Sequence, residues 1–204
     1  MSIAGLLIFF ALLLFAMSLH EFSHGWVAYK LGDTTAKFQG RLTLNPLAHI
    51  DPMGTVVLPL LIFIMSRGQF IFGAAKPVPI NYWALKNPRR DMIWIGFAGP
   101  LSNLLCAAAV SLGLRLLPQA TVLSEILTNF VLINVILGVF NLVPIPPLDG
   151  SRIIMGVLPE QLARSYAGME RFGFIIIIIL FATGILNLLV WPLVNLITGI
   201  LLGA

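Results

Sequence analysis

Residues 3–31 read IAGLLIFFALLLFAMSLHEFSHGWVAYKL, and this stretch decides the class of fold. No Lys or Arg precedes the apolar run, and the run is longer than the roughly 20 residues that a bilayer crossing requires. A cleaved signal peptide normally has a basic beginning and a small-residue cleavage site. We therefore interpret the stretch as a retained first transmembrane helix.

The chain as a whole has the composition of a membrane protein. Of its 204 residues, 59% are hydrophobic and 10% are charged, and the mean hydropathy is +1.00. Soluble domains carry about a quarter charged residues, so the composition excludes a soluble enzyme. The single cysteine, Cys106, excludes an internal disulfide. The basic residues behind the net charge of +4 are scattered, which argues against binding to nucleic acid.

Further apolar runs extend the membrane part along the chain. Residues 91–117, 121–140 and 174–190 are each long enough, or nearly so, to span a bilayer. Residues 53–66 form a shorter run with a proline, which is typical of a re-entrant or interfacial segment. The stretch after Trp191 is also short, and the sequence leaves open whether it continues the preceding span or returns. These runs predict an all-α polytopic membrane protein.

The positive charges predict how the spans are oriented. Eight of the 12 Lys and Arg residues lie between positions 30 and 90 and three lie between 141 and 171, whereas Arg115 stands alone beside Pro118. Short cytoplasmic loops collect Lys and Arg. We therefore expect a multi-pass protein of the plasma membrane, with its N-terminus outside the cell and both basic connections inside.

Ionisable side chains inside a membrane span are costly and therefore point to function. His20, Glu21 and His24 lie in the first span and form the pattern H-E-x-x-H. Residues four apart on a helix share a face, so both imidazoles can reach one zinc ion, with Glu21 beside them as a base for a water molecule. The alternative is a polar cluster whose members satisfy one another inside a helix bundle.

A catalytic zinc ion takes three protein ligands, so one more residue is needed. The candidates are His49, Asp51, Asp91, Glu125, Asp149, Glu160 and Glu170. Asp149 is favoured because it follows Pro144, Pro146 and Pro147, which cannot continue a helix and so unwind the chain at membrane depth. The span 121–140 runs in the same direction as the first span, which brings Asp149 to the level of the two histidines.

Three more polar residues are candidates for contact with a metal ligand or a substrate. Asn103 lies in a span rich in small residues and could form a hydrogen bond to a neighbouring helix. Asn141 could direct an amide at a developing oxyanion, or it could cap the unwound segment. His49 lies in a turn with Asn and Asp, where a structural role is favoured over contact with a metal ligand.

Three segments together resemble the site-2 protease family of intramembrane zinc metalloproteases. They read HEFSH (20–24), GPLSN (99–103) and NLVPIPPLDG (141–150), and their order and spacing agree with the family over about residues 18–152. The resemblance implies one Zn²⁺ per chain held by His20, His24 and Asp149, with Glu21 as general base, in a catalytic core of three transmembrane helices. It also implies hydrolysis of a peptide bond within or near the transmembrane segment of a membrane protein.

The expected organisation is a single membrane-embedded domain over residues 1–204. Its core is expected at about 3–152, followed by one or two transmembrane segments at about 173–203, with no appended peptide-binding or nucleotide-binding module. A short re-entrant or β-like connection joins the first two core helices. Within it, residues 38–44 are hypothesised to form an exposed strand edge that holds unwound substrate.

Two other functions fit parts of the pattern. A membrane zinc or cation transporter also uses broken helices and midplane ligands, but it predicts an internal repeat, which the sequence lacks, and it gives Glu21 no role. A catalytically silent scaffold would be favoured by a missing ligand or base, and none is missing. Metalloprotease activity is therefore the predicted function, with the lipid bilayer and a transmembrane protein substrate as partners.

Overall fold

The computed structural model describes residues 3–57, 64, 75–118 and 121–203. Within these residues the regular elements are all helices, which confirms the predicted all-α class. By length and composition, five of the described helices can cross a membrane: Ile3–Lys30, Pro88–Leu114, Val122–Asn141, Glu160–Ala182 and Ile185–Leu202. The chain is therefore a multi-pass membrane protein.

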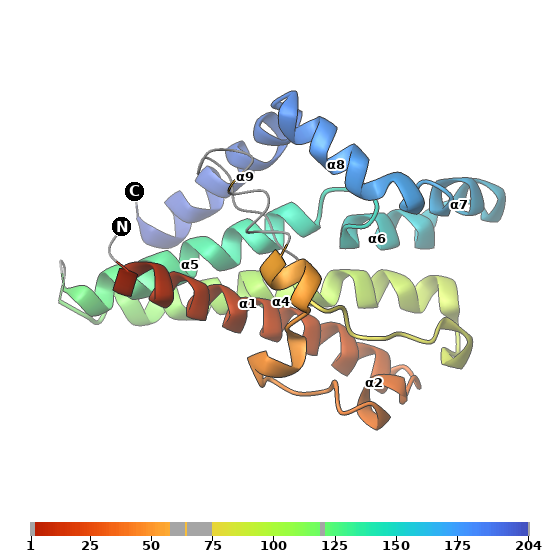
Figure 1. Cartoon of the computed structure of the whole chain (residues 1–204), viewed down its shortest axis with the longest axis horizontal. Coiled ribbons are helices and arrows are strands. Elements are labelled where there is room, and N and C mark those ends of the chain that lie inside the picture. Colours follow the sequence, from red (N-terminus) through yellow and green to blue (C-terminus); the bar gives the residue numbers. More distant parts are fainter. Residues whose placement is uncertain (1–2, 58–63, 65–74, 119–120, 204) are drawn as a thin grey trace.

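Three long helices form the core of the molecule (Figure 1). α1 (Ile3–Lys30) and α5 (Val122–Asn141) run in one direction, and α4 (Pro88–Leu114) runs in the opposite direction. All three pairs of these helices are in contact. The arrangement agrees with the three-helix core expected from the sequence.

One face of α1 packs against the other core helices. Ala16, His20, His24 and Ala28 are spaced four residues apart and are all buried. This spacing keeps the four side chains on one side of a helix with 3.6 residues per turn. Because the two alanines are small, the helix backbones can approach closely on either side of the histidine pair.

Local signals in the sequence set the ends of the core helices. α4 begins with Pro88, which has no N–H to leave unpaired at a helix start. α5 begins with a capping box, in which Thr121 and Ser124 each accept a hydrogen bond from the backbone N–H of the other. Gly32 follows the end of α1 with a φ of +114°, a conformation that favours glycine.

The chain unwinds between α5 and α6 (Asp149–Val157), as its prolines predict. α6 packs against α4 at a point where α4 has a glycine. A Cβ atom at Gly96 would lie 3.1 Å from the backbone oxygen of Asp149 and 3.0 Å from the side chain of Ile153. The small residue therefore lets the start of α6 approach the middle of the core.

The C-terminal region differs from the single span predicted at residues 174–190. After α7 (Glu160–Ala167) and the short η4 (Glu170–Phe172), the chain forms α8 (Gly173–Ala182) and α9 (Ile185–Leu202). Gly184 separates α8 from α9 with a φ of +75°, and this left-handed residue bends the chain.

The stretch after Trp191, which the sequence left open, belongs to α9. This helix passes through Pro192 without ending. α8 and α9 follow one another towards the end of the molecule where both termini lie (Figure 1). Buried side chains of α9, including Val190 and Val194, pack against Val131 and Val135 of α5.

The strand edge predicted at residues 38–44 is wrong. α2 (Thr35–Phe38) occupies the start of this segment, and Gly40 then adopts a φ of +64°. The N–H of Arg41 donates back to the carbonyl of Ala36 at 2.8 Å. These local hydrogen bonds use backbone groups that a strand would offer to a neighbour, so the segment coils.

The rest of the connection between α1 and α4 is made of short helical turns. They are η1 (Pro46–His49), η2 (Pro52–Val57) and η3 (Tyr82–Ala84). The run predicted as re-entrant begins in η2. Apart from residue 64, its part from residue 58 to 66 lies outside the described residues.

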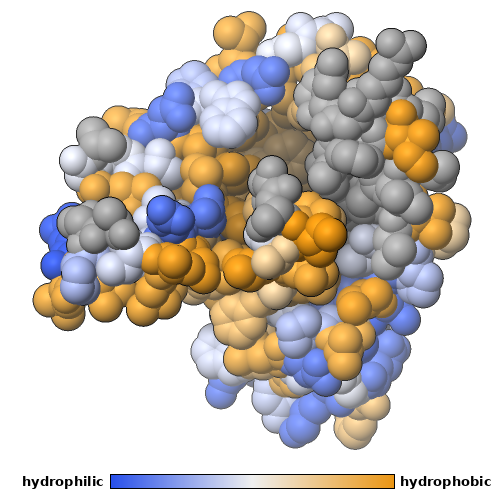
Figure 2. Space-filling view, turned by 60° about the vertical axis from the view of Figure 1, so that its left-hand side comes forward, coloured by the Kyte–Doolittle hydropathy of each residue, from blue (hydrophilic) through white to orange (hydrophobic). Residues whose placement is uncertain are grey.

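Large apolar side chains are exposed on the long helices. Leu7 of α1, Leu105 of α4 and Leu188 of α9 are each at least 60% exposed. Figure 2 shows hydrophobic residues spread over one face of the molecule, interrupted by smaller hydrophilic groups. Exposed apolar surface of this extent is expected where lipid takes the place of water.

Candidate metal centre

His20, His24 and Asp149 converge at one point in the core. Nε2 of His20 lies 2.9 Å and Nε2 of His24 lies 3.0 Å from Oδ2 of Asp149. The two Nε2 atoms are 3.0 Å apart, and the imidazole planes are inclined at 82°. All three side chains are buried. The fold therefore brings together two nitrogens and one oxygen from residues up to 129 positions apart.

The elements that position these side chains are the ones identified from the sequence. The histidines are four apart on α1 and share its buried face. Asp149 is the first residue of α6, directly after the unwound segment. Because α6 packs on α4, and α4 packs on α1, its first carboxylate reaches the histidine pair.

Each imidazole is oriented by a hydrogen bond on its other nitrogen. Nδ1 of His20 lies 2.6 Å from Oδ1 of Asn103, and Nδ1 of His24 lies 2.6 Å from the carbonyl oxygen of Ile95. Both partners come from α4. A carbonyl oxygen only accepts, so the His24 Nδ1 atom carries the proton and its Nε2 atom has a free lone pair.

Gly99 of α4 keeps the space beside the two histidines open. A Cβ atom at this position would lie 2.4 Å from His24 Nε2 and 2.6 Å from His20 Nε2. No real Cβ tolerates contacts this short. The glycine is therefore required by the close approach of α4 to the two ring nitrogens.

The three donors suit a zinc ion. Zinc takes imidazole nitrogen and carboxylate oxygen at about 2.0–2.2 Å in tetrahedral geometry, which sets donor atoms about 3.3–3.5 Å apart. The observed separations of 2.9–3.0 Å need an adjustment of only a few tenths of an ångström. Three protein donors also leave a fourth position for a water molecule or a substrate atom, as catalytic sites require.

Arg152 contacts the same carboxylate from its other side. Its Nη1 atom lies 3.2 Å from Oδ1 of Asp149, one turn along α6. From the sequence, Arg152 is only a charge that reports topology. Its i, i+3 spacing from Asp149 is the signal that could have revealed the contact.

Glu21 does not contact the three donors through any hydrogen bond among the described residues. Its Oε2 atom accepts the N–H of Val78 at 2.7 Å. Val78 lies in the extended segment 75–80, where Arg41 donates to the carbonyl of Lys76 at 2.7 Å. Segment 75–80 therefore contacts the acidic residue of the H-E-x-x-H pattern.

The other sequence candidates lie away from the three donors or serve local structure. Asn103 contacts His20, but Asn141 donates to the carbonyl of Leu137 in its own helix. His49 is buried and its Nε2 atom pairs with the carbonyl of Thr43. The cluster at the metal centre includes none of the remaining acids, which are Asp51, Asp91, Glu125, Glu160 and Glu170.

Several of these acids have structural partners. Asp51 accepts the N–H of Gly54 at 2.6 Å, as expected of a turn residue. Asp91 is buried at the start of α4 and accepts the N–H of Asn87. Glu160 pairs with Arg164 on the exposed face of α7.

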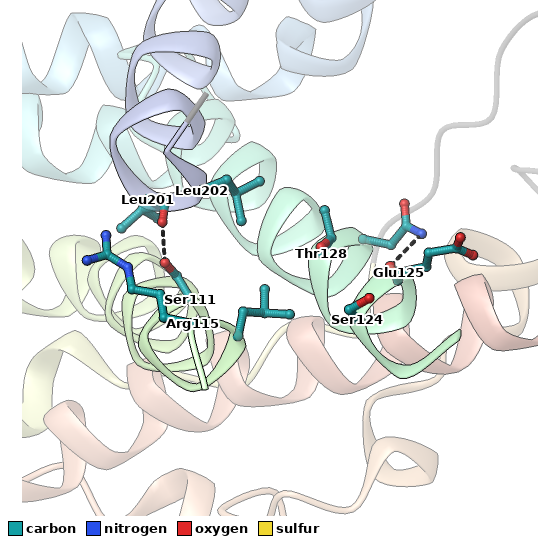
Figure 3. Close-up of a pocket in the computed structure, with 9 residues that line it drawn as sticks. Ser111, Arg115, Ser124, Glu125, Thr128, Leu201 and Leu202 are labelled. Atoms are coloured by element: carbon teal, nitrogen blue, oxygen red, sulfur yellow. Dashed lines mark hydrogen bonds between the residues drawn. The ribbon is translucent and has the colours of Figure 1, made fainter. Parts of the chain in front are cut away.

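A cavity of about 510 Å³ lies at the other end of the core helices (Figure 3). Its walls come from the C-terminal ends of α4 and α9 and the beginning of α5. They include Ser111, Arg115, Ser124, Glu125 and Thr128. The cavity is separate from the metal centre, because Ser111 follows Gly99 by three turns of α4.

The architecture and the donor cluster define a class: a multi-pass membrane protein with a buried two-histidine, one-carboxylate metal centre. Residues 116–183, which include Asp149, match the sequence profile of Peptidase family M50.

Relatives align over most of the chain. The "Putative zinc metalloprotease YwhC" of Bacillus subtilis is 38% identical, over 90% of this chain and 84% of the relative. The "Putative zinc metalloprotease Rip2" of Mycobacterium tuberculosis is 33% identical, over 92% of this chain and 68% of the relative. The "Zinc metalloprotease MJ0392" of Methanocaldococcus jannaschii is 24% identical, over 76% of this chain and 35% of the relative. No solved structure gives a significant match.

These similarities identify the family. The chain belongs to peptidase family M50, the site-2 protease family of membrane zinc metalloproteases. Its enzyme class is therefore that of a zinc-dependent peptide hydrolase.

Proposed function

We propose that His20, His24 and Asp149 hold the single zinc ion and that Glu21 is the general base of peptide-bond hydrolysis. The observation that carries this proposal is the approach of three buried donor atoms to within 3.0 Å of one another. When bound, zinc acts as a Lewis acid that polarises a carbonyl and lowers the pKa of a water molecule.

Glu21 follows His20 directly and is half-buried, so its carboxylate is close to the centre without being a ligand. It takes a proton from the attacking water and returns it to the nitrogen of the leaving amine. The net reaction adds water across one peptide bond. Among the described residues, the N–H of Val78 donates to the Oε2 atom of Glu21. The Oε1 atom is therefore available to a water molecule.

The substrate we propose is the transmembrane segment of another membrane protein, cut within or near the bilayer. The three donors are buried between helices whose length and composition suit a membrane span, so the scissile bond must come to the same depth. Asn141 is our candidate for contact with the substrate carbonyl, because it ends α5 beside the unwound segment. Its amide would first leave the carbonyl of Leu137.

We further propose that the metal centre lies nearer the cytoplasmic side of the plasma membrane. Lys30 at the end of α1, Arg89 and Arg90 at the start of α4, and Arg152 on α6 all belong to the end of the core that carries Asp149. The opposite end has Arg115 and Glu125. The positive-inside rule assigns the end richer in Lys and Arg to the cytoplasm.

The decisive experiment compares Glu21→Gln with the wild type in detergent, using a reporter transmembrane helix as substrate. The variant keeps the size of the side chain and both histidine ligands but cannot accept a proton. We expect cleavage to fall by roughly 10²–10⁴-fold while the zinc content stays at that of the wild type. Glu125→Gln is the matched control, because Glu125 lies in the first turn of α5, at the end of the core opposite the metal centre. This variant should cut normally. Full activity of Glu21→Gln would overturn the assignment of the base.

A further inference from the structure

An asparagine inside the apolar helix α5 is completely buried. Asn134 is 0% exposed and lies outside the three motif segments 20–24, 99–103 and 141–150. A buried amide at membrane depth is costly unless its donors and acceptor are paired. Its position in the middle of α5 therefore calls for partners on the neighbouring helices.

Asn134 is the outer member of a chain of hydrogen bonds that ends at the metal centre. Its Nδ2 atom donates to the carbonyl of Phe130 at 2.9 Å, so its Oδ1 atom is directed at α4. There it accepts a hydrogen bond from Nδ2 of Asn103 at 2.8 Å. Asn103 is also completely buried, and its Oδ1 atom lies 2.6 Å from Nδ1 of His20.

The orientation of the Asn103 amide is fixed by this chain. Its Nδ2 atom has two hydrogens, one donated to the carbonyl of Ala16 at 3.1 Å and the other to Asn134. The reversed orientation would place the amide oxygen against two acceptors and the amide nitrogen against His20. Only the oxygen of Asn103 can therefore face the imidazole.

The consequence is a fixed tautomer of His20. Because the Asn103 oxygen can only accept, Nδ1 of His20 must carry the proton, and Nε2 keeps its lone pair for the metal. His24 reaches the same state by donating to a backbone carbonyl. His20 depends instead on the side chains of Asn103 in α4 and Asn134 in α5.

We propose that Asn134 is a positioning residue: it holds Asn103 so that His20 is kept in its metal-binding tautomer. This inference rests on the zinc site of the proposed function. It assigns a role to α5 in the metal centre, although none of the three donors comes from that helix.

The test measures zinc affinity of the full-length protein in detergent by competition with a chelator. Asn134→Leu keeps the number and branching of the side-chain heavy atoms and removes both hydrogen bonds. We expect it to weaken zinc binding about tenfold, at the low end of the loss seen when partners of metal ligands are removed. Asn129→Leu is the matched control, since the Nδ2 atom of Asn129 donates within its own helix, to the Glu125 carbonyl, among the described residues. This variant should bind zinc as tightly as the wild type.

A double-mutant cycle separates positioning from packing. If Asn134 acts through Asn103, then Asn134→Leu should cause no further loss in an Asn103→Leu background. The absorption spectrum of the cobalt-substituted protein, which reports the ligands of the metal, should change in Asn134→Leu and stay unchanged in Asn129→Leu. Wild-type zinc affinity in Asn134→Leu, or an equal loss in the Asn103→Leu background, would overturn the proposal.

Two controls keep the outcome interpretable. The melting temperature of each metal-free variant reports folding, and Asn134→Ala replaces the leucine variant if that one does not fold. Zinc affinity that is unchanged in His20→Ala and Asp149→Ala would instead contradict the proposed function. If His20→Ala and Asp149→Ala both lose zinc but Asn134→Leu binds it normally, the proposed function stands and only the role of Asn134 is overturned.

Discussion

At the residue scale, the metal centre depends on the missing side chain of Gly99 as much as on the three donors. The space beside the two histidine nitrogens exists because position 99 has no side chain. The Nδ1 atom of each imidazole also faces a carbonyl oxygen of α4, from the side chain of Asn103 for His20 and from the backbone of Ile95 for His24. These features predict how single substitutions separate metal binding from folding.

Gly99→Ala should abolish or strongly weaken zinc binding. The added methyl group would lie 2.4 Å from His24 Nε2, so either the ring or the helix must move. We expect zinc affinity to fall by at least about 100-fold, measured by chelator competition. Gly113→Ala is the matched control on the same helix, where a Cβ meets nothing within 4 Å. Equal zinc affinity of the two variants would show that Gly99 does not adjoin the metal.

Arg152→Gln should weaken zinc binding several-fold while leaving the fold intact. The substitution removes a charged partner from the Asp149 oxygen that faces away from the histidines, and partners of this kind orient metal ligands. Arg164→Gln is the control, because Arg164 pairs with Glu160 on an exposed surface where such pairs contribute little. The measurement is the zinc dissociation constant, and a loss of equal size in both variants would contradict a role specific to Arg152.

Sequence and structure agree best where chemistry depends on local spacing. His20 and His24 are predictable because four positions on a helix always share a face. Asp149 is predictable because prolines must interrupt the helix before it. The contact between Asn134 and Asn103 is not predictable from motifs, since it depends on which side chains face one another after α4 and α5 pack.

At the element scale, the connection between α1 and α4 acts as a support for the site. Arg41 holds the extended segment 75–80 at Lys76, and Val78 of the same segment donates to Glu21. Asp33 fixes the end of the segment, because its two carboxylate oxygens accept the N–H groups of Thr35 and Asn81. Residues 38–44 coil instead of forming the predicted strand because the N–H groups of Gly40 and Arg41 donate to carbonyls of the preceding turn.

Asp33→Asn should loosen this support. An asparagine offers one oxygen for two N–H donors, so one part-buried donor loses its hydrogen bond to a charged acceptor, at a cost of about 1.5–3 kcal/mol. We expect a lower melting temperature and faster proteolysis between residues 75 and 87. Asp51→Asn is the matched control, since the N–H of Gly54 donates to a single oxygen of Asp51 among the described residues, and asparagine keeps one oxygen. Identical proteolysis of both variants would exclude the supporting role of Asp33.

Span boundaries were predictable only where the composition changes. The core spans were anticipated because polar and basic residues border them, and α4 and α5 begin at recognisable caps. The bend at Gly184 was missed because it lies inside a continuous apolar stretch, where hydropathy gives no signal. A glycine in such a run is the one indication that a bend is permitted.

At the scale of the whole molecule, the charge distribution predicts orientation. We propose that Leu116, at the end with Arg115, is outside the cell and that Trp83, in the basic connection, is inside. Both side chains are almost fully exposed, at 87% and 96%. In a Cys106→Ala background, an impermeant maleimide should label Leu116→Cys in intact cells and Trp83→Cys only after permeabilisation. The reverse pattern would invert the proposed topology.

The spacing of the donors along the chain also has a consequence during synthesis. His24 precedes Asp149 by 125 residues, so at 5–20 residues per second the ribosome needs about 6–25 s to supply the last donor. Until α6 emerges, the nascent chain has a histidine pair and an acid but no complete centre. With the ligands proposed above, hydrolytic competence therefore arrives only when most of the polypeptide has already been made.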